Sequence, residues 1–143
     1  MTVQLTKDLY TAEVSVQGGR QNGHAVSADK TFDVRITPPT DMGGSGEGTN
    51  PEELFAAGYA ACFQGALGVV ARRQKVDTGE STVTAKVTLG SIDGGGFGLK
   101  VALEVAIPGV DSDTVQQLIE AAHQVCPYSN ATRGNIEVDL RAV

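Results

Sequence analysis

An uncharged stretch of 18 residues, from Leu54 to Ala71, constrains the fold of this chain more than any other feature. It reads LFAAGYAACFQGALGVVA, and as a helix rising about 1.5 Å per residue it would approach the thickness of a bilayer's hydrocarbon core. The stretch is nevertheless dominated by alanine and glycine, contains Gln64, and is the only such run in the sequence. We therefore expect a helix buried on most sides inside a soluble protein, and no membrane-spanning segment.

Both ends of this expected helix carry residues that favour helix termini. Asn50 can cap the first turn, and Pro51 suits the first helical position. Glu53 lies three residues after the cap, where its carboxylate can reach back to the N–H of Asn50. The other end carries the cations that the helix macrodipole favours there, Arg72, Arg73 and Lys75.

Alternation of apolar and polar residues predicts strands in the first third of the chain. It is clear over residues 10–16 and 32–36, and a further short strand is expected near residues 24–27. Residues 18–23 read GGRQNG, a composition typical of a turn, because Gly and Asn tolerate positive φ. Arg20 therefore lies on a loop.

The second half of the chain predicts a hairpin, a helix and a last strand. Alternating residues over 83–89 and 97–107 flank a glycine-rich turn and indicate two paired strands. Apolar residues at helical spacing from Val115 to Cys126 predict a second buried helix, and residues 136–140 predict a final strand. The resulting order, β-β-β-α-β-β-α-β, is an α+β pattern.

Length and charge exclude several classes of protein. The 143 residues fit one domain, residues 1–143. The net charge of −6, from 11 basic and 17 acidic side chains, has the wrong sign for attracting nucleic acid or anionic lipid. Two cysteines are too few for a disulfide-stapled scaffold, and the start MTVQLTKDLY lacks a secretory signal pattern. We expect a cytoplasmic protein whose thiols are kept reduced.

Two further patterns are weak. The glycine-rich loop over residues 43–48 does not match a dinucleotide fingerprint, because Thr49 replaces the third glycine and Glu47 adds negative charge. It is interpreted as a flexible loop. His123 stands three residues before Cys126, but a metal site would need further ligands. We expect no bound metal or cofactor.

Cys62 and Cys126 are the two features that suggest chemistry. Both lie on predicted buried helices, 64 residues apart in the sequence. Such a pair could cycle between dithiol and disulfide through a sulfenic acid. Cysteine is also common in inert protein cores, so the residues by themselves support a redox pair and a structural pair equally.

Two long segments favour the redox interpretation. Residues 50–63 read NPEELFAAGYAACF and residues 126–135 read CPYSNATRGN. They closely resemble the signature segments of the organic hydroperoxide resistance (Ohr) proteins, a branch of the Ohr/OsmC family of thiol peroxidases. The resemblance extends over essentially the whole chain, including the loop at residues 18–23.

The resemblance implies an OsmC-like fold in an intertwined homodimer, with central helices flanked by β-sheets. It also implies reduction of organic, notably fatty-acid, hydroperoxides in resistance to oxidative stress, with electrons from dihydrolipoyl groups on lipoylated proteins. At the matching positions, the reactive thiol falls on Cys62, the resolving thiol on Cys126, the arginine on Arg20 and the carboxylate on Glu52.

The chemistry explains why a cation is needed near the thiols. Only a thiolate opens a peroxide bond, and Cys62 lies about 15 Å along the helix from Glu52, too far from the positive helix end. Arg20 is the candidate cation, and Glu52 can orient it in bidentate geometry. If Arg20 bridges Glu52 and Cys62, the same 15 Å suggests that the carboxylate comes from the partner chain.

Two rival functions stay open at this stage. A hydrolase with Cys62 as acyl nucleophile would need a base, and only His24 and His123 are available. A non-catalytic binding module would have inert thiols. Four aromatic residues could line an apolar pocket for alkyl hydroperoxides or could be ordinary core residues: Phe55, Tyr59, Phe63 and Tyr128.

Overall fold

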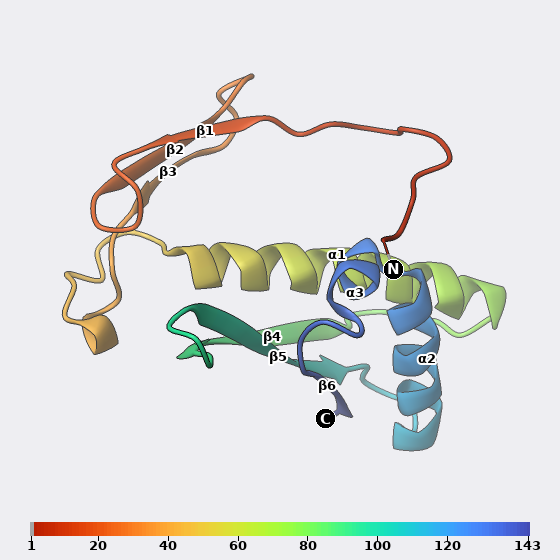
Figure 1. The fold of residues 1–143 in the computed structure, drawn as a ribbon. Coiled ribbons are helices and arrows are strands. Elements are labelled where there is room, and N and C mark those ends of the chain that lie inside the picture. The colour runs from red at the N-terminus through yellow and green to blue at the C-terminus, as the bar shows by residue number, and fades with distance from the viewer. Residues whose placement is uncertain (1) are drawn as a thin grey trace. The chain divides into compact units, whose positions relative to one another are not determined.

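The computed structural model describes residues 2–143 and confirms the α+β prediction (Figure 1). Its elements follow the expected order, with a short 3-10 helix before the first α-helix and a six-residue α-helix after the second. The chain divides into two compact units: the first ends at Leu54, and the second covers Phe55–Val143. The interpretation of residues 1–143 as a single domain stays a prediction.

The first unit contains a small antiparallel sheet in the order β1-β2-β3. Its strands are β1 (Val14–Gln17), β2 (Gly23–Ser27) and β3 (Asp33–Ile36), and the 3-10 helix η1 (Thr40–Met42) follows. Among the described residues of this unit, 2–54, two apolar side chains are buried, Ala25 and Ile36, and every residue of β1 is exposed. A sheet this small has almost no core of its own.

The first strand is shorter than predicted. Alternation suggested a strand from residue 10, but β1 begins at Val14. The reason is that β2 ends at Ser27, where the chain turns through Lys30 at a φ of 65°. Residues 10–13 therefore extend past the end of their partner strand, and only the carbonyl of Glu13 still accepts a backbone hydrogen bond, from Ala28.

The glycine-rich loop over residues 43–48 is joined to Pro38 and Pro39 by backbone hydrogen bonds, and its interpretation as a flexible loop stays a prediction. The N–H of Gly44 donates to the carbonyl of Pro39 at 3.0 Å, and the N–H of Gly46 donates to that of Pro38 at 3.1 Å. A Cβ atom on Gly44 would lie 2.1 Å from the carbonyl oxygen of Pro38. Glycine is present here because two backbone segments approach closely.

Helix α1 (Pro51–Arg73) begins as predicted, with one difference. The Asn50 side chain accepts a hydrogen bond from the N–H of Glu53 at 2.9 Å, which confirms the cap. The carboxylate of Glu53 does not reach back to the N–H of Asn50, as a capping box would require. It accepts instead from the hydroxyl of Thr49 at 3.1 Å.

The second unit contains a sheet in the order β4-β5-β6. The predicted hairpin is confirmed as β4 (Thr82–Ser91) and β5 (Phe97–Ala106), paired antiparallel from Thr82 opposite Ala106 to Ser91 opposite Phe97. The last strand, β6 (Val138–Ala142), pairs in parallel with β5. Alternate residues of β5 point into the core: Val101, Leu103 and Val105.

Helix α2 (Ser112–Val125) ends one residue before Cys126. The prediction that Cys126 continues this helix is wrong, because its backbone is extended, with φ −63° and ψ 123°. The following Pro127 explains the break, since a proline disfavours helical backbone in the residue before it. Pro127 then begins α3 (Pro127–Thr132), so that Cys126 is the hinge between two helices.

Helix α1 is long and apolar enough to span a bilayer by length and composition alone. One of its faces fills the core of the second unit through Tyr59, Phe63 and Leu67, each fully buried, as in the core helix of a soluble fold. Ala57, Ala61 and Gly65 are exposed on the other side, so the prediction of burial on most sides is wrong within one chain.

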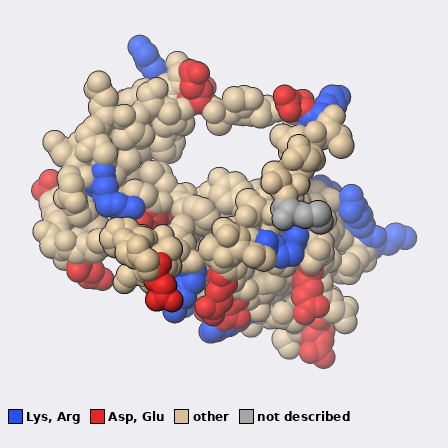
Figure 2. Space-filling view, viewed as in Figure 1, with Lys and Arg blue, Asp and Glu red and all other residues tan. Residues whose placement is uncertain are grey.

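On the face in Figure 2, acidic and basic side chains are interspersed.

Candidate functional site

The two cysteines meet in the second unit. The sulfur atoms of Cys62, on α1, and Cys126, between α2 and α3, are 3.6 Å apart. Both are free thiols; Cys62 is partly exposed, whereas Cys126 is 0% exposed. A disulfide bond is about 2.05 Å long, so the two sulfurs are within a short movement of bonding. The structure therefore brings together the two thiols that the sequence singles out.

The surroundings of Cys62 within the second unit do not favour its thiolate. Burial raises the pKa of the Cys62 thiol above its ordinary value, and the neighbouring Cys126 thiol raises it further. The backbone N–H of Tyr128 acts in the opposite direction and lowers that pKa in part. Additional positive charge is therefore needed to make Cys62 a good nucleophile near neutral pH.

Arg20 and Glu52 form an ion pair in the first unit. The Arg20 Nη1 atom donates to Glu52 Oε2 at 2.8 Å, while the side chain of Glu52 is only 15% exposed. The hydrogen bond from Arg20 lowers the pKa of Glu52, and the same bond raises the pKa of Arg20. The contact is single, so the expectation of bidentate geometry is wrong.

The loop before Arg20 explains how the sequence presents it. Gly18 has a φ of 85°, and a Cβ atom there would lie 2.0 Å from the carbonyl oxygen of Asn22. Only glycine fits such a turn. The contact with Glu52 forms within one chain, so no partner chain is needed to bring Glu52 to Arg20.

An apolar pocket of about 480 Å³ lies in the second unit. Pro127 and Tyr128, the two residues after Cys126, line it together with Phe55 and Ile136. The rings of Phe55 and Tyr128 meet edge to face, with centroids 6.1 Å apart. The four aromatic residues thus divide: these two line the pocket, while Tyr59 and Phe63 are fully buried in the core.

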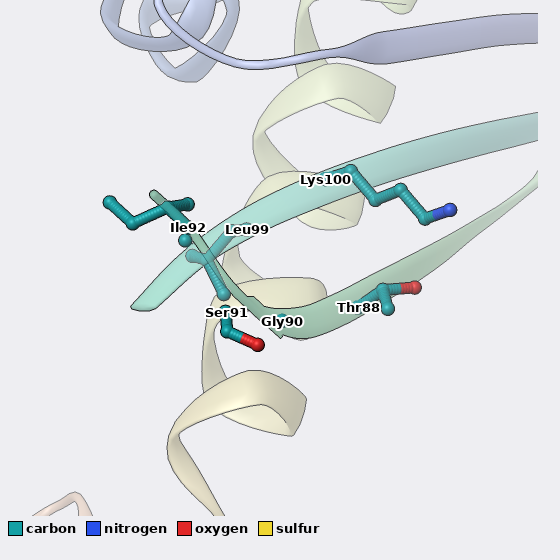
Figure 3. A pocket seen from close by; sticks show the side chains of 7 residues that line it. Thr88, Gly90, Ser91, Ile92, Leu99 and Lys100 are labelled. Atoms are coloured by element: carbon teal, nitrogen blue, oxygen red, sulfur yellow. The ribbon is translucent and has the colours of Figure 1, made fainter. Parts of the chain in front are cut away.

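A second hollow, of about 310 Å³, lies at the tip of the β4–β5 hairpin (Figure 3). It is centred on Gly90 and Gly98, which face each other across the two strands. Ser91, Ile92 and Lys100 are among its other lining residues. Unlike the first pocket, it is lined neither by the aromatic residues expected to form an apolar pocket nor by residues that follow Cys126 in the sequence.

Sequence reasoning missed three hydroxyl groups near the thiols. The Tyr59 hydroxyl lies 2.8 Å from Ser129 Oγ and 3.1 Å from Thr132 Oγ1, and all three residues are buried. The sequence suggested a role only for the ring of Tyr59. The available signal was the presence of Ser129 and Thr132 on one side of a short segment after Cys126, three residues apart as helical neighbours are.

The histidines are not joined to the thiols by any hydrogen bond among the described residues. His24 Nε2 lies 2.6 Å from Asp33 Oδ1 in the first unit, and His123 Nδ1 is buried without a hydrogen-bond partner within residues 2–143. Burial lowers the pKa of His123. Within the second unit, His123 makes no hydrogen bond with Cys62, so it does not supply the base that the hydrolase alternative requires. Across residues 2–143, no cluster of three or more His, Cys, Asp or Glu side chains could hold a metal ion.

A fold of this kind, carrying two adjacent thiols on its core helix and the hinge beside it, can be compared directly with known proteins. The family model described as "OsmC-like protein" matches residues 44–141. An organic hydroperoxide resistance protein of Xanthomonas axonopodis pv. citri is 54% identical over 136 residues, which cover 94% of each chain. The crystal structure of an organic hydroperoxide resistance protein from Elizabethkingia anophelis superposes with a TM-score of 0.89 at 54% identity, covering 96% of this chain and 98% of that one.

The structure of OhrB from Bacillus subtilis gives a TM-score of 0.86 at 45% identity, over 95% of this chain and 100% of that one. The chain therefore belongs to the OsmC-like family, in the branch of the organic hydroperoxide resistance proteins.

Proposed function

We propose that this protein is a cysteine-based peroxidase that reduces organic hydroperoxides to alcohols and contributes to resistance to oxidative stress. The observation that carries the proposal is the 3.6 Å separation of the Cys62 and Cys126 sulfur atoms. The protein belongs to a branch whose relatives are named organic hydroperoxide resistance proteins, and this supports organic hydroperoxides as the class of substrate.

The proposed cycle uses the different exposure of the two thiols. The Cys62 thiolate attacks the distal peroxide oxygen, which gives a Cys62 sulfenic acid and, after protonation, an alcohol. The Cys126 thiol then condenses with the sulfenic acid, forming the Cys62–Cys126 disulfide and water. Cys62 is the partly exposed thiol and meets the peroxide, whereas the fully buried Cys126 is reached only from Cys62.

We assign the activation of Cys62 to Arg20, held by Glu52. Within its own unit the Cys62 pKa is raised, so the thiolate needs a cation from elsewhere. The guanidinium of Arg20 has further N–H donors beyond the one bonded to Glu52, and these can stabilise a thiolate and the departing peroxide oxygen. Pairing with Glu52 offsets the cost of placing a cation among apolar groups.

The Arg20–Glu52 pair of one chain is proposed to serve Cys62 of the partner in a homodimer. On α1, Glu52 and Cys62 are about 15 Å apart, which is long for one arginine to bridge. The exposed small residues of α1 and the thin core of the first unit leave apolar surface for a second copy to cover. Mixing Cys62→Ser with Glu52→Ala subunits tests this sharing, because each heterodimer then keeps one intact site. Inactive heterodimers would show that both residues act within one chain.

The substrate and reductant are assigned by the chemistry of the site. The apolar pocket lined by Pro127 and Tyr128, the two residues after Cys126, suits an alkyl or fatty-acid chain and disfavours hydrogen peroxide, which has no apolar part to bury. A dithiol is needed to reopen an intramolecular disulfide, and dihydrolipoyl groups on lipoylated proteins are proposed as that donor in the cytoplasm. No bound cofactor takes part.

One mass-spectrometric experiment tests the proposal. The reduced protein is treated with one equivalent of an alkyl hydroperoxide, quenched with an alkylating agent and digested. We expect a loss of about 2 Da and a Cys62–Cys126 linked peptide, because disulfide formation removes two hydrogen atoms. Free thiols at both positions after treatment would refute the peroxidase assignment and leave an inert binding module.

A further inference from the structure

We propose that Tyr59 is a positioning residue, whose hydroxyl holds Cys126 within reach of Cys62 and so decides whether an oxidised Cys62 is resolved or over-oxidised. This inference rests on the proposed function. Tyr59 lies three residues before Cys62 on α1, close to one helical turn. Its hydroxyl hydrogen-bonds with Ser129 at 2.8 Å and with Thr132 at 3.1 Å.

The two hydroxyl partners lie on the segment that carries Cys126. Cys126 is the residue immediately before α3, and Ser129 and Thr132 are on that helix. The Cys126 carbonyl accepts from the N–H of Asn130 at 2.9 Å, so Cys126 is part of the first turn of the same rigid segment. The hydroxyl of Thr132 also lies 3.3 Å from the Ser129 carbonyl, which ties the hydroxyl groups into one network. A helix anchored at Ser129 and Thr132 therefore also fixes Cys126 relative to α1.

This anchor is needed because no covalent bond joins the thiols before oxidation. The segment after Cys126 is a helix of only six residues, and a short helix of this kind is not stable by itself. Tyr59, Ser129 and Thr132 are all nine-tenths or more buried. Breaking their hydrogen bonds would leave polar atoms without partners, so the network is expected to persist through the catalytic cycle.

The consequence is a competition between two reactions of the Cys62 sulfenic acid. Resolution joins Cys62–SOH and Cys126–SH into a disulfide and water. Over-oxidation converts Cys62–SOH and a second hydroperoxide into a sulfinic acid and an alcohol, and it is irreversible in most proteins. Resolution is intramolecular, so its rate depends on how often the two sulfurs lie within bonding reach.

Tyr59→Phe tests the proposal, because it removes the hydroxyl and keeps the ring. The ring of Tyr59 packs against Tyr128 at 5.7 Å and against Phe55 at 6.1 Å, and both contacts should persist. We expect the ratio of sulfinic acid to disulfide, measured by peptide mass spectrometry at fixed peroxide excess, to rise about five-fold, the effect of one lost hydrogen bond. The rate of the first oxidation of Cys62 should change less than about two-fold, since Tyr59 does not touch the peroxide.

Three further variants separate positioning from folding. Tyr10→Phe removes the same atom from an exposed tyrosine and should leave the ratio unchanged. Ser129→Ala removes the nearer partner and should raise the ratio, and the Tyr59→Phe, Ser129→Ala double variant should raise it less than the product of the single effects. Thr132→Ser keeps the hydroxyl group and should behave as wild type.

A wild-type ratio in a folded Tyr59→Phe protein would overturn the positioning role, and so would a loss of first oxidation that matches the loss of resolution. Should Tyr59→Phe not fold, a wild-type ratio in Ser129→Ala would overturn it equally. Failure of the proposed function looks different, because the wild-type protein would then form neither disulfide nor sulfinic acid.

Discussion

Cys62 and Cys126 are 64 residues apart in the sequence, yet their sulfur atoms are 3.6 Å apart. One sits within the core helix and the other at the hinge between two helices of the same compact unit. Cys62 is partly exposed whereas Cys126 is fully buried, and this difference in exposure is the basis of the proposed order of reaction, in which Cys62 meets the oxidant and Cys126 resolves it.

Removing the inner thiol should uncouple oxidation from turnover. In Cys126→Ser, we expect Cys62 to react once with an alkyl hydroperoxide and then to accumulate as sulfinic acid, because no thiol remains to form the disulfide. Sustained turnover with a dithiol reductant should fall at least about ten-fold. Cys62→Ser is the matched control and should lose the first reaction as well. Undiminished turnover in Cys126→Ser would show that resolution does not need this residue.

Removing the activating cation should change the pH dependence of Cys62. Burial raises the pKa of this thiol, so in Arg20→Ala we expect alkylation of Cys62 to require a higher pH than in the wild type. If the midpoint of Cys62 alkylation rises by one pH unit, the thiolate fraction at pH 7 falls about ten-fold. The rate at which Cys62 reacts with a hydroperoxide falls with it.

Arg35→Ala is the control for the loss of positive charge. Arg35 is a second arginine of the first unit, and its guanidinium donates a hydrogen bond to the Asn22 side chain at 3.4 Å. The pH profile of Cys62 alkylation in Arg35→Ala should match that of the wild type. Identical profiles in wild type and Arg20→Ala would remove Arg20 from the proposed site.

The Arg20–Glu52 pair should contribute a small, pH-dependent stability. Arg20 lowers the pKa of Glu52 in the folded chain, so the pair stabilises the folded state above the ordinary carboxyl pKa, and this stabilisation is lost as the pH falls through the lowered value. We expect Glu52→Gln to reduce the free energy of unfolding at pH 7 by about 1 kcal/mol or less, because Arg20 is partly exposed.

The difference should shrink when urea unfolding is repeated at successively lower pH, because protonation of the Glu52 carboxyl group in the folded chain removes its ion pair with Arg20. Glu53→Gln, which alters the neighbouring carboxylate bonded to Thr49, serves as control and should not reduce the activity of Cys62. A difference for Glu52→Gln that grows at low pH would contradict a lowered pKa of Glu52 in the folded chain.

Filling the space beside Tyr128 should change the apolar pocket. A Cβ atom on Gly58 would lie 2.8 Å from the Tyr128 hydroxyl oxygen and 3.2 Å from its ring, so Gly58→Ala must displace this side chain. Tyr128 lines the pocket, and we expect KM for a long-chain hydroperoxide to rise several-fold while a short-chain substrate is less affected.

Gly68→Ala is the matched control for that substitution, because a Cβ atom there meets only the end of the Arg72 side chain, at an ordinary contact distance of 3.5 Å, and the gain in helix propensity is the same. Equal effects of both substitutions, or equal effects on both substrates, would indicate that the pocket does not hold the alkyl chain.

Local features of the structure could be predicted from the sequence because they depend on neighbouring residues. The cap of α1 by Asn50, the β4–β5 hairpin and the glycine turn that presents Arg20 follow from turn chemistry and periodicity within short windows. The two signature segments were also enough to indicate the family, because each is long and specific.

Predictions failed where a distant or competing contact decided the outcome. The strand expected from residue 10 stops short because β2 ends before it, and the Glu53 carboxylate accepts from the Thr49 hydroxyl rather than from the Asn50 N–H. The helix expected to run through Cys126 breaks at Pro127, a local signal whose consequence is the hinge that turns Cys126 toward α1.

The sequence by itself determined the two thiols, the arginine, the carboxylate and the amphipathic and turn patterns that place each one on its element. Only the tertiary structure decided that the sulfurs approach to 3.6 Å and that Tyr59, Ser129 and Thr132 share their hydroxyl groups. The physical reason is that periodicity specifies which face of a helix is buried, whereas the distance between two atoms on different helices depends on how all the side chains between them pack.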